Sequence, residues 1–514
     1  SPATLTLDFY RTWFENQLAI EPSGYVEAWR SIADAFNDID GVDGANGVEL
    51  NHETFMVNAL YSPDQLRHRM TYALSQLFVI SADFDFSHHD QLVLGYVDVL
   101  HENAFGNYRD LMERVTLHPA MGLFLAMLGN EKADPSKNIR PDENYAREIM
   151  QLFTIGLLEL NQDGTPALDD RGNVVQTYWP VDIQNYAAAL TGWYFADLEP
   201  YRFGSTFHSV EWSQRLAPMT SYDDHHQKTQ KKLLRNYYVP AGASAEESLS
   251  AVLDSLFYHP NLAPFVSEHL IKSFVTSNPS PEYVGRVSAV FNSNETGERG
   301  NLGSVLQAIL FDPEARLAAG EQPSTYGRAK DPLLRFVNFQ RFFEVEGYDP
   351  DRREHLRRSP SQQFLKAPNV FNFFSPTHVP NADFAALDLV APELQILTSD
   401  ALVQDSSYYA YMSTKEELEA DTGATDQQKQ NWTYYKLGDL PQIAEQQGTF
   451  AVIEYLDTYL TQGRLSEASK QALFERYDYA IATSLQNGNR GWFLGIFRQM
   501  IYQVASSPEY YVQR

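Results

Sequence analysis

The segment from Pro141 to Asn161, PDENYAREIMQLFTIGLLELN, places acid, base and amide side chains at helical spacing. At about 100° per residue, Asn144, Arg147 and Glu148 fall on one polar side of a helix, and apolar residues fill the opposite side. One interpretation is a solvated amphipathic helix with Glu143 and Arg147 as an i,i+4 ion pair. The other is a catalytic face, with Glu148 as the acid or base and Arg147 binding an anionic group.

The residues after this helix help to distinguish a solvated helix from a catalytic face. The stretch Thr165–Tyr178 has a turn-like DDRGN between two short β-prone runs and predicts a small hairpin. Such a hairpin lets the helix with Glu148 pack beside a helix that carries Trp193, whose ring then lines a cleft. A glutamate against an apolar wall has a raised pKa, which suits a general acid. The alternative is a buried polar network that holds the helices in register.

Metal ligands in this chain are limited to histidines and carboxylates, because it has no cysteine. Asp38, Asp40 and Asp43 stand at short spacings among glycines and could supply oxygen ligands to calcium, although the segment lacks the register of an EF-hand. A loop exposed to solvent explains the same residues. The histidine clusters DFDFSHHDQ and YDDHHQK lack the i,i+4 pair of HExxH, so solvated loops are the simpler interpretation for both.

The elements that must position these residues are helices. SPDQLRHRM offers Ser62 as an N-cap followed by Pro63 and Gln65, and SAEESLSAV offers Ser244 with Glu247. The fold class predicted is mostly α, a multi-helix globular body with a small β-hairpin insertion. The whole of 1–514 is expected to be one helical region, with possible subdivisions at 1–128, 129–240, 241–400 and 401–514.

Composition excludes several classes of function. Acidic residues number 67 and basic residues 39, a formal charge of −28, which argues against binding to a nucleic-acid backbone. No apolar run reaches the roughly 18–20 residues of a membrane span. No serine-hydrolase elbow, phosphate loop or dinucleotide-binding fingerprint appears in the sequence.

Several long blocks resemble one bacterial family, the domain of unknown function 1800. The segment Glu143–Glu148 is similar to its NENYARE signature, and Leu190–Trp193 to its LTGW block. Further blocks in the family's order are DQLRHRMTYALSQLFVIS, APNVFNFFSPTHVP and SSPEYYVQR. The resemblance implies helical proteins that are secreted or periplasmic and often encoded beside a sulfatase-like companion. It implies no particular activity.

One block departs from the family pattern. Where the family commonly has a His-Asp pair followed by a lysine, HHQKTQKKLL gives His226, Gln227 and Lys231. A relay or metal site at that pair would therefore lack its carboxylate here, unless Asp223 or Asp224 substitutes. His226 and Lys231 join Trp193 as residues expected to line the substrate site.

Two functions follow as expectations. The first is a secreted, hydrolase-like enzyme acting on extracellular polymer, with Glu148, Arg147 and Asn144 as catalytic residues. The second is a non-catalytic extracellular scaffold or binding protein that assembles with itself or with the sulfatase-like companion.

Overall fold

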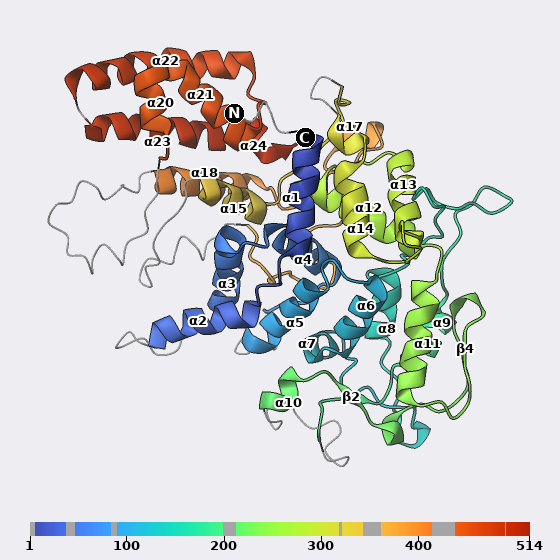
Figure 1. The fold of residues 1–514 in the computed structure, drawn as a ribbon. Coiled ribbons are helices and arrows are strands. Elements are labelled where there is room, and N and C mark those ends of the chain that lie inside the picture. Colours follow the sequence, from blue (N-terminus) through green and yellow to red (C-terminus); the bar gives the residue numbers. More distant parts are fainter. Residues whose placement is uncertain are drawn as a thin grey trace. The chain divides into compact units, whose positions relative to one another are not determined.

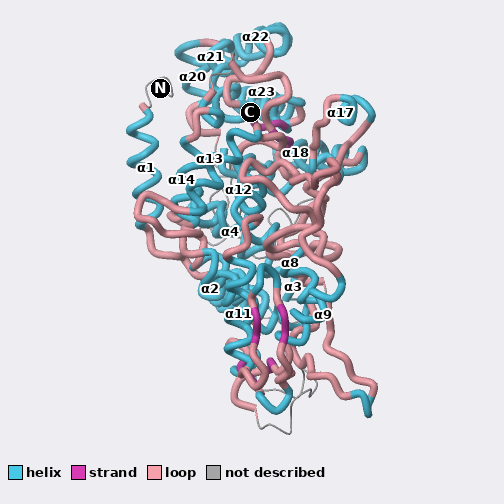
Figure 2. The backbone as a smooth tube through the Cα atoms, turned by 90° about the vertical axis from the view of Figure 1, so that its right-hand side faces the viewer, coloured by secondary structure: helices cyan, strands magenta, loops and turns pink. Residues whose placement is uncertain are grey.

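The computed structural model describes residues 6–37, 47–83, 90–198, 212–317, 321–342, 361–413, 437–488 and 490–514. Helices dominate this part of the chain, and the strands are short and paired two by two (Figures 1 and 2). The prediction of a mostly α fold with a small β insertion is confirmed. Among the described residues, no helix is long and apolar enough to cross a membrane.

The chain divides into two compact units. Unit 1 comprises residues 1–326 and 365–372, and unit 2 comprises 327–364 and 373–514. The four subdivisions expected from the sequence remain predictions.

The first half of unit 1 gathers helices around a buried α5 (Asp90–Glu102), most of whose apolar side chains are inaccessible to solvent. The helices that precede and follow it in the chain are α1 (Leu7–Ala19), α2 (Tyr25–Asn37), α3 (Gly47–Tyr61), α4 (Gln65–Leu77), α6 (Tyr108–Leu117) and α7 (Pro119–Phe124). Because α2, α3, α4, α6 and α7 all pack on α5, polar groups on its surface are carried into the interior.

The rest of unit 1 begins with the signature helix α8 (Asn144–Gln151) and continues through α9 (Pro180–Ala189) and α10 (Trp212–Leu216). It ends with α11 (Ala245–Phe257), α12 (Leu262–Phe274), α13 (Pro281–Asn292) and α14 (Leu302–Phe311). Two antiparallel strand pairs lie between α9 and α11, namely β1 (Trp193–Tyr194) with β2 (Thr220–Ser221), and β3 (Lys231–Lys232) with β4 (Tyr238–Val239). The capping box at Ser244 and Glu247 is confirmed, with both reciprocal hydrogen bonds present.

The predicted hairpin is present between α8 and α9. Leu168 and Val174 face each other across its two strands, and the Asp169 N–H donates to the Asn173 carbonyl at 2.8 Å to close the turn. We call residues 157–177 the arm. In Figure 1 it is the teal segment that extends outward beside α13, where the Cβ position of Gly164 lies 3.0 Å from Val284.

Unit 2 is also helical. Its one strand pair in the described residues joins β5 (Arg328–Ala329) to β6 (Val512–Gln513). Its helices are α15 (Pro332–Phe342), α17 (Ala382–Ala386), α18 (Ser399–Ser413), α20 (Leu440–Gln447), α21 (Thr449–Leu456), α22 (Glu467–Asn487), α23 (Arg490–Ala505) and α24 (Pro508–Tyr511), with a π-helical turn at Asp457–Thr461. Arg335 on α15 is fully buried.

Candidate functional site

The signature helix α8 presents its charged residues in two different environments. Arg147 and Glu143 form the predicted ion pair, 3.1 Å between Nη2 and Oε2, and both side chains are about as exposed as buried. Asn144 is exposed, and its backbone N–H donates to Asp142 Oδ1 at 2.8 Å. Glu148, by contrast, is only 5% exposed. The helix therefore has a solvated edge and one glutamate turned inward.

Glu148 lacks a partner for one of its carboxylate oxygens. Among the described residues, no hydrogen bond reaches its buried Oε2. Burial raises the pKa of Glu148, and the charge of Arg147 opposes that shift. Burial and the neighbouring Glu148 together raise the pKa of Tyr178 to about 12. Tyr178 in turn lies 3.4 Å from Gln151 Oε1, so Glu148 belongs to a small polar group with Arg147, Tyr178 and Gln151.

Trp193 lies in strand β1 and not in a helix, because α9 ends at Ala189. Gly192 explains the break: its φ of +88° belongs to the left-handed region, and its Cβ position would lie 3.0 Å from the backbone N of His226. Its N–H donates to the Asn130 carbonyl at 2.8 Å. Trp193 itself is buried, and its Nε1 has no hydrogen-bond partner among the described residues.

His226 and Lys231 form a second buried group, with Ser248 of α11. His226 Nδ1 lies 2.9 Å from the Thr191 carbonyl, so this nitrogen carries the proton and donates it. Nε2 then accepts from Ser248 Oγ at 2.9 Å and lies 3.4 Å from Lys231 Nζ. Burial lowers the pKa of His226, and it lowers that of Lys231 to about 8. A hydroxyl and a histidine in this arrangement resemble a nucleophile and its base, but all three side chains are enclosed.

Gln227 occupies the position at which the family resemblance led us to expect aspartate. Its side-chain carbonyl accepts the Ala133 N–H at 3.0 Å, and its amide donates to Thr229 Oγ1 at 3.1 Å. A carboxylate could accept the first of these bonds equally well. The substitution thus keeps a loop contact, and no metal or proton relay is needed to explain the position.

The predicted site residues therefore form two groups. No hydrogen bond or ion pair within the described ranges joins Glu148 or Arg147 to His226 or Lys231. The backbone does bring their motifs together: Asn130 hydrogen-bonds Asp142 just before α8 and also Gly192. The calcium ligands expected at Asp38, Asp40 and Asp43 lie outside the described residues.

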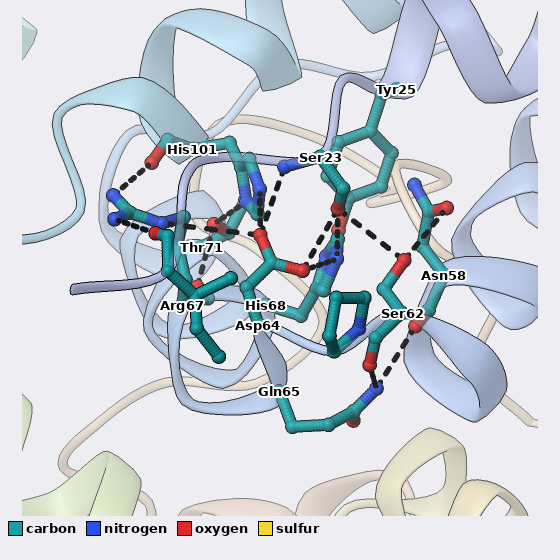
Figure 3. Close-up of polar contacts among 12 residues, drawn as sticks. Ser23, Tyr25, Asn58, Ser62, Asp64, Gln65, Arg67, His68, Thr71 and His101 are labelled. Atoms are coloured by element: carbon teal, nitrogen blue, oxygen red, sulfur yellow. Dashed lines mark hydrogen bonds and ion pairs between the residues drawn. The ribbon is translucent and has the colours of Figure 1, made fainter. Parts of the chain in front are cut away.

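A third polar group, which was not predicted from the sequence, consists of Asp64, His68 and His101 (Figure 3). Asp64 immediately precedes α4, His68 lies one turn into α4, and His101 lies in the last turn of α5. All three side chains are buried. His68 Nε2 lies 3.1 Å from Asp64 Oδ1, and His101 Nε2 lies 2.9 Å from Oδ2. Both imidazoles therefore converge on one carboxylate.

The loop before α2 completes this group. The Ser23 N–H donates to Asp64 Oδ2 at 3.0 Å, and Ser23 Oγ lies 2.9 Å from both Asp64 Oδ1 and His68 Nε2. Burial alone would raise the pKa of Asp64, but its hydrogen bonds with His101, His68 and Ser23 hold it well below its ordinary value.

This arrangement is not a Ser-His-Asp triad. In a triad the acid binds Nδ1 and the serine binds Nε2 of the same imidazole. Here Asp64 and Ser23 share Nε2 of His68, and Nδ1 is 2.8 Å from the Tyr25 hydroxyl. Nδ1 of His101 is likewise 2.8 Å from Thr71 Oγ1. A metal-bound histidine also has its second ring nitrogen held by a hydrogen bond, so these three residues could form a metal-binding set.

The sequence carried a signal for this group. The predicted capping box at Ser62 is wrong: α4 starts at Gln65, Asp64 is the residue before it, and Gln65 Nε2 donates to the Ser62 carbonyl. Asp64 and His68 stand four residues apart at a helix start, which places both side chains on one face. That spacing could have indicated the pair. His101 lies far along the chain, and only the packing of α5 on α4 brings it in.

The fold and these groups define a mostly helical protein with several buried polar networks. The family model described as "Protein of unknown function (DUF1800)" matches residues 6–512, and the chain belongs to this family. No curated protein and no solved structure matches the chain.

Proposed function

We propose that this protein is a secreted or periplasmic binding protein, and that the arm is the surface with which it docks on a different protein chain. The observation that carries the proposal is the exposure of apolar side chains on the arm. Leu168 and Val174, directly opposite each other near its tip, are 61% and 51% exposed. Contiguous apolar side chains on a projecting element favour protein contact.

The base of the arm is held firmly. Asn261, fully buried, donates through Nδ2 to the Leu158 carbonyl at 2.7 Å and accepts the Leu160 N–H at 2.9 Å. Arg235 Nη2 donates to both carboxylate oxygens of Glu159, at 2.8 and 2.7 Å. A docking element fixed before it meets its partner loses less conformational entropy on binding. The arm is therefore suited to recognition.

The charge of the chain favours a partner other than a second copy. Two molecules each carrying 28 negative charges repel one another at low ionic strength. A neutral or basic surface on a different chain avoids this cost and gains electrostatic attraction. The sulfatase-like companion expected from the family resemblance is the partner proposed.

Replacing both Leu168 and Val174 by serine is expected to weaken complex formation with the companion by about tenfold or more, since the contact loses two apolar side chains. Complex formation is measured by size-exclusion chromatography with light scattering, on each protein alone and on the mixture. Tyr479→Ser, at a side chain 80% exposed in unit 2, is the matched control and should bind normally. If the wild-type protein elutes alone in the mixture, the proposal is contradicted. If the protein forms a homodimer that the double variant disrupts, the partner of the arm is a second copy and not the companion.

A second candidate function is a hydrolase-like enzyme acting on extracellular polymer, with Glu148 as its acid. The buried, unpaired Oε2 and the raised pKa of Glu148 are the observations that favour it. Arg147 and Asn144 on the solvated edge of α8 are then the groups that contact substrate.

The variant Glu148→Gln separates the two functions. An acid catalyst would lose turnover by about 100-fold or more. The melting temperature should stay constant or rise, because burial already disfavours the charged form of Glu148. Hydrolysis of neutral and anionic polysaccharides is the assay, and Glu143→Gln, which removes the exposed partner of Arg147, is the control. Equal turnover by wild type and Glu148→Gln would eliminate this candidate.

A further inference from the structure

The group around Asp64 has the donor set and spacing of a metal centre. Its three ligand atoms, one from each of Asp64, His68 and His101, lie within 4.8 Å of one another. An ion bound at about 2.0–2.2 Å separates neighbouring ligand atoms by about 3.0–3.5 Å. His68 Nε2 lies 3.1 Å from Asp64 Oδ1, and His101 Nε2 lies 2.9 Å from the other oxygen, Oδ2. Small shifts of the side chains would thus admit an ion.

The hydrogen bonds around His101 also fit a metal ligand. Thr71 has one hydroxyl proton, and its Oγ1 lies 2.8 Å from the Arg67 carbonyl, to which it can donate. If Thr71 donates there, His101 Nδ1 is the group that donates to Thr71 Oγ1, at 2.8 Å. In a neutral imidazole of this tautomer the lone pair of Nε2 faces Asp64 Oδ2, at 2.9 Å. A lone pair beside a carboxylate oxygen is the arrangement that a metal ion can bridge.

The remaining contacts orient the two imidazoles and offer a fourth donor atom to the ion. Tyr25 holds Nδ1 of His68 as Thr71 holds that of His101, so each imidazole is oriented by a hydroxyl. Ser23 Oγ, 2.9 Å from both Asp64 and His68, occupies the place of a fourth ligand. The two imidazoles are stacked with centroids 4.4 Å apart, which fixes their relative orientation.

Arg67 and Asp98 are charged groups that lie close to this group. Arg67 is the nearby cation, with Nε 3.9 Å from Asp64, but its guanidinium donates to the Ile20 carbonyl at 3.0 Å and lies over the Phe105 ring. Asp98 accepts the Tyr25 N–H at 2.5 Å and adds a second acidic group. The carboxylates therefore offset the guanidinium.

We propose that Asp64, His68 and His101 bind one divalent transition-metal ion of the zinc class, with Ser23 at the fourth position. Imidazole and carboxylate ligands in a four-coordinate set suit Zn²⁺. Since the ligands come from the loop before α2, the start of α4 and the end of α5, the ion would fasten these three elements together. A closed set of this kind is structural. This inference is independent of the docking role of the arm.

The test is a Zn²⁺ titration of the full chain after metal has been removed with a chelator and dialysis. A chromogenic chelator that competes for Zn²⁺ reports the affinity. We expect one Zn²⁺ per chain, a melting temperature that rises with Zn²⁺ concentration, and visible absorption bands when Co²⁺ replaces Zn²⁺. His101→Gln should lower the affinity by at least about 100-fold, and Thr71→Val, which removes only the outer hydroxyl, by about 10- to 100-fold. His225→Gln, at a histidine paired with Glu131, should bind as wild type does.

Two results would overturn the metal site. One is a folded wild-type protein, checked by far-UV circular dichroism, that takes up no Zn²⁺. The other is uptake that is the same in wild type, His101→Gln and Thr71→Val, which would place the ions on exposed acidic groups. If His101→Gln does not fold, Thr71→Val decides alone, because an unchanged affinity in that variant removes the role assigned to the hydroxyl.

Discussion

Replacing Arg335 by alanine is expected to lower the free energy of unfolding by about 3–5 kcal/mol, the cost of leaving a buried charge without its partner. Arg335 is fully buried and binds Asp405 through Nη2. Its guanidinium also lies 4.1 Å from the centre of the Tyr511 ring. Burial raises the pKa of Asp405, and Arg335 opposes the shift. Alanine at 335 would strand this carboxylate in an apolar interior.

The double variant Arg335→Met with Asp405→Leu distinguishes this cause from lost packing. With both charges replaced by apolar side chains, most of the lost stability should return, because no charge remains to be desolvated. Urea unfolding followed by circular dichroism measures all variants. Lys228→Ala, at an exposed pair 3.2 Å from Asp223, should change the free energy by less than about 1 kcal/mol. A double variant as unstable as Arg335→Ala would show that packing and not charge explains the loss.

Local sequence rules predicted the elements whose causes are local. Ser244 and Glu247 form a capping box because both partners lie within one helical turn. The arm turns at Asp169–Asn173 because Asp169 Oδ1 accepts the N–H groups of Arg171 and Asn173. The ion pair of Glu143 and Arg147 needs only the helix itself. In each case the neighbouring residues are sufficient.

Features that depend on tertiary packing were missed or misplaced. Trp193 was expected in a helix, but the close approach of His226 to Gly192 imposes a left-handed residue and ends α9 early. The N-cap was expected at Ser62, whereas Asp64 holds that position and its carboxylate contacts His101 of another helix. No short-range pattern encodes either contact. Candidate sites made from distant segments therefore require the fold.

Glu148 illustrates an intermediate case. Helical periodicity placed it on the polar side of α8, yet the protein buries it. Its position at the border between the two faces made both outcomes compatible with the pattern. α9 packs on α8, as the hairpin between them permits, and Tyr178 just before α9 lies near Glu148. Periodicity thus identifies a face, and the neighbouring elements decide how much of that face is covered.

Acidification is expected to destabilise the protein through three buried histidines. Burial lowers the pKa values of His52, His118 and His259 to about 3, against about 6.5 in an unfolded chain. Between these values the unfolded chain binds more protons, so stability falls as pH falls from about 6.5 toward 3. Burial raises the pKa of Asp90 to about 7 and of Asp98 to about 6, which acts in the opposite sense. Among these five groups the three histidines outweigh the two carboxyls, and their combined contribution between pH 7 and 4 is a loss of about 4 kcal/mol.

His118→Asn tests the histidine contribution directly. His118 caps α7 by accepting the Ala120 N–H on Nδ1 at 3.2 Å, a bond that protonation would break. An asparagine oxygen can accept the same N–H without titrating. The variant should therefore keep near wild-type stability at pH 7 and lose about 3 kcal/mol less than wild type between pH 7 and 4. Urea unfolding at half-unit pH steps measures both curves. Parallel curves would mean that His118 does not take up a proton on unfolding, and the acid sensitivity would have to arise elsewhere.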